Sequence, residues 1–457
     1  MSAPPFPLRA PAAGRGRNPS TRLGVAVIAL SLLIALVGLI IIGAPVFMAM
    51  AGASLIHYWE TGREATMNIL TLRMFDGMTS FTFLAIPLFL LAGEIMSRGG
   101  LTDRLMDLAR ALVGHFKAGL AQVNIASSLF FSSISGSAYA DVAAMGPVMI
   151  PAMQKEGYPR GFAGALTAAS ATLSPLFPPS IVLIIYGSAF SVSIGALFAA
   201  GLTIALALTL LFGLVTYAMV WRYGIPTHGW LGLGELGRTF IKAAIPLGMP
   251  IIVVGGILGG FFTATEAASV AVAYGLVVTV GIYRTIRLRE LIPIIRQTAI
   301  TSAAITILVG VAAMFSYVVV RRNIPTQVVD FLLQITQSPI GIVALIILVL
   351  LIAGMFIDRN SNLLLLGPII IPIFTMELGF SDVQTAMIII SALGVGHLTP
   401  PFGGTLLTAS LVGKMSVAEI SRYAWPFILV KIVLTALIVA IPALSEALPR
   451  ALGFGGI

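Results

Sequence analysis

Long runs of apolar residues, separated by short polar breaks, recur from Leu23 to Leu444. A helix needs roughly 20 mostly apolar residues to cross a bilayer. Ten runs approach or exceed this length and are predicted to span the membrane: 23–42, 44–59, 80–97, 159–188, 193–221, 243–260, 264–283, 297–320, 382–412 and 424–445. The hydrophobic pattern therefore predicts an all-α polytopic membrane protein.

Two further apolar stretches, 119–153 and 339–377, are each interrupted by a cluster of small or polar residues. The clusters are 132–137 and 358–362. Each half of a stretch has about 15 residues, which is too short to cross the bilayer without tilting. Irregular backbone is tolerated at membrane depth only where protein or a water-filled cavity surrounds it. Both stretches are therefore predicted to be re-entrant helical hairpins.

Glycine and proline landmarks recur in the same order in two parts of the chain, at a shift of 221 or 222 residues. The pairs are Gly146-Pro147 with Gly367-Pro368, Ile150-Pro151 with Ile371-Pro372, Gly157 with Gly379, and Pro178-Pro179 with Pro400-Pro401. Several matches in one order favour a duplication over chance. Five predicted crossings, an odd number, separate the entries of the two hairpins, so the hairpins enter from opposite faces. The pattern predicts an inverted-topology repeat.

The repeat divides the chain into six segments. They are a disordered tail, 1–22; N-terminal helices, 23–118; repeat 1, 119–223; connecting helices, 224–338; repeat 2, 339–446; and a C-terminal tail, 447–457. No short signal peptide is expected, because the apolar run after the tail continues to Trp59. Fifteen Lys and Arg fall on the face of the first hairpin and nine on the other. The positive-inside rule then places the first hairpin on the cytoplasmic side.

Composition supports a membrane protein and argues against several classes of function. The chain is 58% hydrophobic and 9% charged, with a mean hydropathy of +1.04, whereas soluble domains are about 25% charged. Its net charge of +9 is spread singly between apolar runs, so no nucleic-acid partner is expected. The absence of cysteine excludes disulfides and thiolate metal sites. Zinc-protease, nucleophile-elbow and phosphate-loop motifs are also absent, so no enzyme is expected and coupling to an ion gradient is favoured over ATP hydrolysis.

Four predicted helix breaks could hold a ligand: 133–137, 174–180, 358–362 and 394–401. At a break in a membrane helix, freed carbonyls and half-helix C-termini can ligate a cation, and half-helix N-termini attract an anion. An ordinary proline kink is the alternative for any single break. Four breaks paired by the repeat fit that alternative less well.

Oxygen-bearing side chains near the breaks suit a hard cation such as Na⁺. They are Ser135, Ser137, Asn360, Ser361, Asn362 and Thr399. The alternative for each hydroxyl is a bond to its own helix backbone. Ionisable residues at membrane depth are costly and usually functional. The candidates are Asp141, Asp358, Glu94 and Glu266, with Arg359 able to neutralise Asp358 and with His397 as a ligand or proton relay. Helix capping is the alternative for Asp141 and Asp358, and a simple hydrogen bond is the alternative for His397.

At these motifs the sequence resembles the large membrane subunit of the tripartite ATP-independent periplasmic (TRAP) transporters, the DctM or SiaM type. The resemblance covers about residues 23 to 446, and only the 22-residue tail departs from it. It rests on segments in the same order: 83–94, 135–138 with Asp141, 260–268, 354–358 and 399–403.

This resemblance implies an elevator-type transporter of the bacterial inner membrane. It implies Na⁺ as the coupling ion, no other cofactor, a small four-helix membrane subunit and a periplasmic substrate-binding protein as partners. The substrate would be a small organic anion, a carboxylate or a sugar acid. By position in the matching motifs, one Na⁺ site comprises Ser135, Ser137, Ser174, Phe177 and Pro179. The repeat suggests a second Na⁺ site at Gly396, Thr399 and Pro401, together with the hairpin that carries Asp358. The expected substrate-binding residues are Ser137, Asp141, Asp358, Asn360 and Asn362.

Three other functions remain open at this point. An inverted-repeat, Na⁺-coupled carrier that works without a binding protein is the nearest. A membrane-embedded enzyme would need a convergent catalytic pair, and a channel would need a continuous pore. The sequence shows neither feature.

Overall fold

The computed structural model describes residues 31–454 except 33, 62–63, 222–223, 226 and 228. All regular secondary structure in this part of the chain is helical, and eight of its helices are long and apolar enough to cross a membrane. The predicted all-α membrane class is confirmed. The predicted tail, 1–22, and residues 23–30 and 33 of the first predicted span, 23–42, lie outside the described residues.

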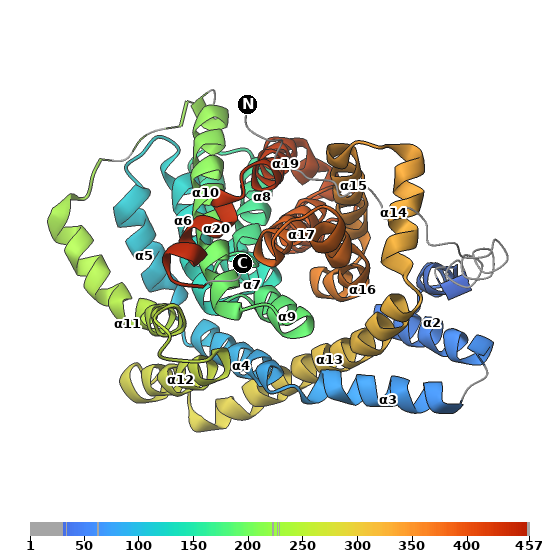
Figure 1. Ribbon diagram of the computed structural model, residues 1–457. Helices are drawn as coiled ribbons and strands as arrows, with labels where there is room; N and C mark the ends of the chain where they lie inside the picture. Colours follow the sequence, from blue (N-terminus) through green and yellow to red (C-terminus); the bar gives the residue numbers. More distant parts are fainter. Residues whose placement is uncertain are drawn as a thin grey trace.

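An outer group of helices runs along the bottom of the molecule and up its left and right sides in the view of Figure 1. It contains α2 (Val46–Thr61), α3 (Glu64–Thr79), the 3₁₀ turn η1 (Phe81–Leu84), α4 (Ala85–Arg98), α5 (Thr102–Val113), α11 (Gly232–Leu258), α12 (Ala264–Leu276) with the π-helical η4 (Val277–Ile282), α13 (Leu288–Arg321) and α14 (Ile324–Ile335). Helix α13 packs along α2, α3 and α4, and α12 packs on α4 and α11. The long α13 thereby joins the N-terminal helices into one support.

An inner group packs against this support. Its first part is α6 (Gly119–Ser135), α7 (Ala138–Lys155), α8 (Arg160–Ser170), the 3₁₀ turn η2 (Ala171–Leu173), α9 (Ile181–Phe190) and α10 (Ile194–Val220). Its second part is α15 (Pro339–Phe356), α16 (Arg359–Pro372), the π-helical η5 (Ile373–Glu377), α17 (Asp382–Gly396), α18 (Gly404–Gly413), α19 (Val417–Ala440) and α20 (Ala443–Ala451). The two parts interlock, because α18 packs on α7 and α8, and α19 packs on α8.

The same order of elements occurs in both parts: a helical hairpin, then a helix that breaks and resumes. Hairpin 1 is α6–α7 and hairpin 2 is α15–α16; the broken helices are α8–α9 and α17–α18. Landmarks paired in the sequence have similar backbone geometry, since Gly157 and Gly379 both have positive φ and both Pro-Pro bonds are cis. The inverted orientation of the two parts and the elevator movement stay predictions.

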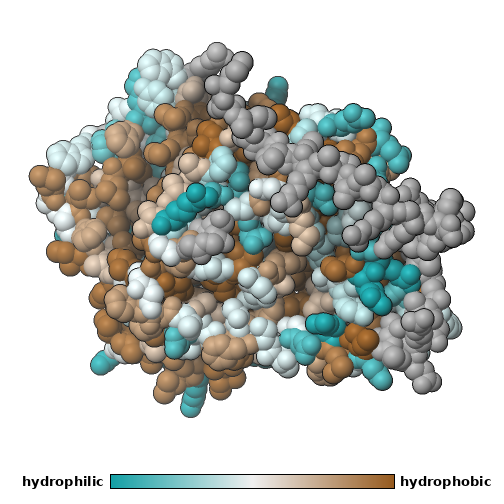
Figure 2. Space-filling view, in the orientation of Figure 1, coloured by the Kyte–Doolittle hydropathy of each residue, from teal (hydrophilic) through white to brown (hydrophobic). Residues whose placement is uncertain are grey.

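Many large apolar side chains face outward. Phe240, Ile241, Ile251 and Phe261 are each more than half exposed, and Figure 2 shows hydrophobic residues over much of the visible face, including the side where α11 and α12 lie. Soluble monomers rarely expose such continuous apolar surface. These side chains are suited to contact with lipid.

Several helices differ from the predicted spans. Helix α3 occupies a segment left as a connection, because Arg73 and Asp76 interrupt its apolar run, and it is held by packing on α13. Helices α5 and α14 were also missed; both are only 12 residues long. Helix α20 crosses the border drawn between 446 and 447. Because Arg73, Arg289 and Arg296 lie within helices and not in loops, the charge count does not fix the orientation, which stays a prediction.

Candidate functional site

The tip of hairpin 1 lies against the break between η2 and α9. Helix α6 ends at Ser135 and is followed by Gly136, and Ser137 caps α7 by accepting a hydrogen bond from the Ala140 amide at 3.4 Å. Gly136 has φ +60°, and a Cβ atom there would come within 2.7 Å of the Pro179 carbonyl oxygen. Glycine is the residue that tolerates this conformation and leaves room for the neighbouring backbone. The structure therefore brings Ser135 and Ser137 close to the segment that carries Ser174, Phe177 and Pro179.

Asp141 ties this tip together from within. Its side chain is fully buried, and its two carboxylate oxygens accept hydrogen bonds from the hydroxyl groups of Ser128 at 3.1 Å and Ser174 at 3.2 Å. Ser174 also shares a 2.7 Å hydrogen bond with Ser132. The capping role considered for Asp141 belongs to Ser137 instead. Asp141 thus links α6, α7 and the first break.

Sequence reasoning singled out Ser132 and Ser174 but missed the rest of the polar stripe around Asp141. Asn124, Ser128 and Ser132 follow one another at four-residue spacing along α6, so they share one helix face. This face contacts Thr167 and Ser170 on α8 and Ser174 at the first break. The hydrogen bonds between the two sets include Asn124 Nδ2 to Thr167 Oγ1 at 2.8 Å and Ser128 Oγ to Ser170 Oγ at 3.1 Å. The four-residue spacing of polar residues inside an apolar stretch was a signal available in the sequence.

The tip of hairpin 2 is built by a helix cap. Asp358 precedes α16, and its Oδ1 accepts hydrogen bonds from the amides of Asn360 at 3.0 Å and Ser361 at 3.2 Å, so its capping role is confirmed. Asn362 donates from Nδ2 to the Ile357 carbonyl at 2.9 Å. The Oδ1 atoms of Asn360 and Asn362 are buried and have no hydrogen-bond partner among the described residues. Buried polar atoms are nearly always paired, so these two oxygens suit a ligand or an ordered water molecule.

The second break, between α17 and α18, adjoins hairpin 2. A Cβ atom on Gly396 would come within 2.7 Å of the Cα of Gly354, near the end of α15. The Thr399 hydroxyl donates to the Val395 carbonyl at 2.7 Å, and the Nδ1 atom of His397 lies 3.1 Å from the Leu393 carbonyl. The structure thus places Gly396 and Thr399 at one break next to hairpin 2, with Pro401 on its exposed side. His397 has the simple hydrogen bond that was its alternative.

The two halves meet at Tyr139, which sequence reasoning also missed. This residue lies in the first turn of α7, and its ring centroid is 6.2 Å from that of His397. A Cβ atom on Gly404 would approach the Tyr139 hydroxyl to 2.5 Å. Tyr139 therefore joins the tip of hairpin 1 to the second break. A single aromatic residue in an apolar helix gives no distinguishing pattern.

Two candidate carboxylates have local structural partners. Glu94 pairs with Arg98 one turn along α4, with a distance of 3.0 Å from Oε2 to Nε. Glu266 caps α12 in a reciprocal arrangement with Thr263. Neither lies at a hairpin tip, and the contacts of both explain their presence by local structure.

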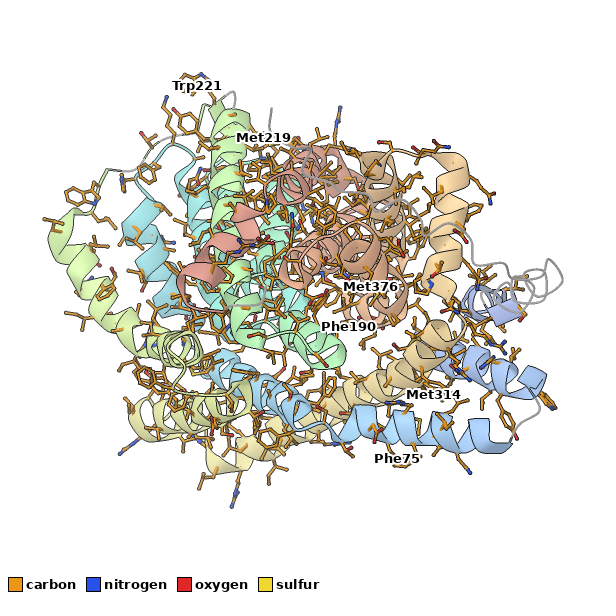
Figure 3. The ribbon with its side chains drawn as sticks, in the orientation of Figure 1. Phe75, Phe190, Met219, Trp221, Met314 and Met376 are labelled. Atoms are coloured by element: carbon orange, nitrogen blue, oxygen red, sulfur yellow. The ribbon has the colours of Figure 1, made fainter. Side chains whose placement is uncertain are left out.

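A cavity of about 550 Å³ separates part of the outer group from the inner group. Residues from α3, α9, α13 and α16 line it, among them Arg73, Asp76, Phe190, Tyr317, Arg321 and Pro368. Figure 3 shows Phe190 at the end of α9 on the side that faces α13, with Met314 on α13 and Phe75 on α3. The inner group is therefore not packed tightly against the support along this whole side.

The sequence matches the family model described as tripartite ATP-independent periplasmic transporter, DctM component, over residues 33–444. The chain belongs to this family. It is the large permease subunit of a TRAP transporter, a multi-pass protein of the bacterial inner membrane and not an enzyme. The resemblance inferred from the motifs is thereby confirmed.

Named relatives of this permease cover most of its length. The sialic acid TRAP transporter large permease protein SiaM of Vibrio cholerae is 35% identical over 92% of this chain and 98% of its own length. The C4-dicarboxylate TRAP transporter large permease protein DctM of Pseudomonas aeruginosa is 34% identical over 85% of this chain and 91% of its own length. The ectoine/5-hydroxyectoine TRAP transporter large permease protein UehC of Ruegeria pomeroyi is 33% identical over 91% of this chain and 97% of its own length.

Solved structures with a similar fold are transporters. The Alcanivorax borkumensis YdaH transporter has a TM-score of 0.57, with 15% identity over 83% of this chain and 90% of its own. The Neisseria gonorrhoeae MtrF structure has a TM-score of 0.53, with 15% identity over 80% and 83%. At this identity the likeness concerns the fold alone.

Proposed function

We propose that this TRAP permease takes up a small organic anion, a carboxylate or a sugar acid, and that uptake is coupled to Na⁺. The observation that carries the proposal is the meeting of each hairpin tip with a helix break. At such places backbone carbonyls leave their helical partners and can ligate a cation near the membrane midplane.

The oxygens at the tips support Na⁺ as the ion. Ser135, Ser137 and Ser174 bring hydroxyl groups to the first tip. The second tip offers the Oδ1 atoms of Asn360 and Asn362, which have no hydrogen-bond partner in the described part of the chain. Hard cations prefer oxygen ligands of this kind. We assign the primary Na⁺ site to Ser135, Ser137, Ser174, Phe177 and Pro179, and a second to Gly396, Thr399 and Pro401.

The relatives support an anionic substrate without fixing it. Sialic acid, C4-dicarboxylates and ectoine, named for three of them, all carry a carboxylate group, and ectoine balances it with a positive charge of its own. We place the substrate near Ser137, Asp141, Asp358, Asn360 and Asn362, where the N-terminal ends of α7 and α16 favour negative charge.

Membership of a tripartite family implies two partners. We propose a small four-helix membrane subunit, which would extend the outer group of helices, and a periplasmic binding protein that delivers the substrate. The exposed apolar surface of the outer group provides area for such a subunit.

Reconstitution with one component omitted at a time tests this assignment. With a Na⁺ gradient present, we expect uptake from vesicles that contain the permease, the small subunit and the binding protein, and background uptake when any one is left out. Robust uptake by the permease alone would instead support the stand-alone Na⁺-coupled carrier.

A further inference from the structure

Two cationic side chains are buried inside the inner group. Arg359, the first residue of α16, is 5% exposed, and Lys431, on α19, is 1% exposed. None of the ion pairs formed between described residues includes either of them. Burying an ion without a counter-charge costs several kcal/mol in real proteins. Their presence needs an explanation beyond folding.

Both side chains point to the same place on α17. A Cβ atom on Gly394 would lie 3.5 Å from Nη2 of Arg359 and 2.9 Å from Nζ of Lys431. Lys431 donates a hydrogen bond to the Thr172 hydroxyl at 3.0 Å, next to the first break. Glycine at 394 lets both cationic groups approach the backbone of α17. The two positive charges therefore lie close together, where each raises the energetic cost of the other.

Arg359 keeps unused hydrogen-bond donors. Its Nε and Nη2 atoms are buried and have no partner among the described residues. The neighbouring carboxylate of Asp358 is exposed, and its Oδ1 accepts from two backbone amides. A guanidinium group presents its N–H donors in a planar fork that matches a carboxylate. The donors are thus unsatisfied, cationic and of the right geometry for an anion.

We propose that Arg359, supported by the positive charge of Lys431, binds a carboxylate group of the transported substrate. The proposal rests on the transport function proposed above and adds the residue that would select for charge. A bound carboxylate supplies the missing acceptors and the missing negative charge together. Because Arg359 directly follows the tip of hairpin 2, it would link substrate binding to the position of that hairpin.

This role has a consequence for stability that a structural arginine would not share. Removing an uncompensated buried charge relieves its desolvation cost, so Arg359→Gln should unfold at an equal or higher temperature than wild type when no substrate is present. Arg160 provides the matched control. Its Nη2 donates to the carbonyls of Gly413 at 2.9 Å and Lys414 at 2.5 Å, so Arg160→Gln should unfold at a lower temperature.

The test is the thermal unfolding of the purified permease with its small subunit, titrated with mono-, di- and tricarboxylates and with the uncharged amide or ester of each. We expect wild type to be stabilised by one or more carboxylates and not by the matched amides or esters. Arg359→Gln should need about tenfold more of the same carboxylate, or fail to respond. Arg359→Lys should retain part of the response, and Arg160→Gln should retain all of it.

Three results would overturn the proposal. In the first, carboxylates stabilise Arg359→Gln as much as they stabilise wild type. In the second, wild type is stabilised equally by acid and amide, or by no carboxylate; in the third, Arg359→Gln without ligand unfolds at a lower temperature, as Arg160→Gln does. The same samples are also titrated with NaCl and, separately, with KCl, to test the coupling ion independently. If NaCl raises the unfolding temperature of wild type no more than KCl does, the proposed Na⁺ coupling is contradicted and the assignment of Arg359 is unaffected.

Discussion

Asp141 and Asp358 both lie at the start of the second helix of a hairpin, but their side chains make different contacts. Asp358 accepts hydrogen bonds from the amides of Asn360 and Ser361 and so caps α16. Asp141 instead accepts hydrogen bonds from Ser128 and Ser174, which are 13 and 33 residues away. Contacts over such separations depend on how hairpin and break pack, and periodicity does not reveal them. Lys431 could have been found, since a lone lysine in an apolar span is itself a functional signal.

Asp358 is predicted to act in transport as well as in capping. Asp358→Asn keeps the side-chain oxygen that accepts from the Asn360 and Ser361 amides and removes the charge. We expect normal abundance in the membrane, because the cap is kept. We expect uptake reduced about tenfold, which corresponds to about 1.4 kcal/mol, because the negative charge at the tip of hairpin 2 is lost. Uptake by vesicles with equal amounts of permease is the measurement, and wild-type uptake would leave Asp358 with the capping role alone.

Ser135 and Ser137 are predicted to bind Na⁺ through hydroxyl and carbonyl oxygens together. Alanine at either position removes one hydroxyl and keeps the carbonyl, and the hydrogen bonds lost are long, 3.4 Å each. We therefore expect stable proteins with partial loss, seen as a higher Na⁺ concentration for half-maximal uptake. Ser193→Ala, which loses a similar 3.3 Å cap on α10, serves as the control. Equal Na⁺ curves for all variants would remove these hydroxyls from the site.

At the scale of elements, the sequence predicted the interruptions better than the continuous helices. Polar clusters and Pro-Pro pairs marked both hairpin tips and both breaks, because proline ends a regular helix and polar side chains cap the helix that follows. Helices α3, α5 and α14 were missed because they are short or charged and are stabilised by packing, which hydropathy does not measure. Helix α13 begins nine residues before the predicted span, at Leu288 instead of 297, for the same reason.

The contact between hairpin 1 and the first break can be tested at its glycine. Gly136→Ala adds a Cβ atom 2.7 Å from the Pro179 carbonyl in a residue with φ +60°. We expect a loss of about 1–3 kcal/mol from crowding in addition to about 1–2 kcal/mol from the left-handed backbone. Gly260→Ala, with φ +73° and open space around it, carries the backbone cost alone. Thermal unfolding in detergent compares the two variants. If both lower the unfolding temperature by the same amount, the close contact at Gly136 is contradicted.

At the scale of the whole molecule, an interlocked group of hairpins and broken helices lies beside a support built around α13. The cavity between α13 and α16 shows that the two groups are not packed against each other along their full length. Such an arrangement fits the predicted elevator movement, in which the inner group would move against a fixed support. Composition predicted the membrane class, and the motifs predicted the family. The packing of the two groups required the structure.

Uptake with and without a Na⁺ gradient tests the central claim most directly. Vesicles containing the permease and its small subunit are supplied with the binding protein loaded with substrate, and external NaCl is compared with KCl at equal ionic strength, with no ATP present. We predict accumulation of substrate only with an inward Na⁺ gradient, and a loss of accumulation when an ionophore collapses that gradient. Undiminished accumulation in KCl, or a strict need for ATP, would contradict the proposed Na⁺-coupled transport.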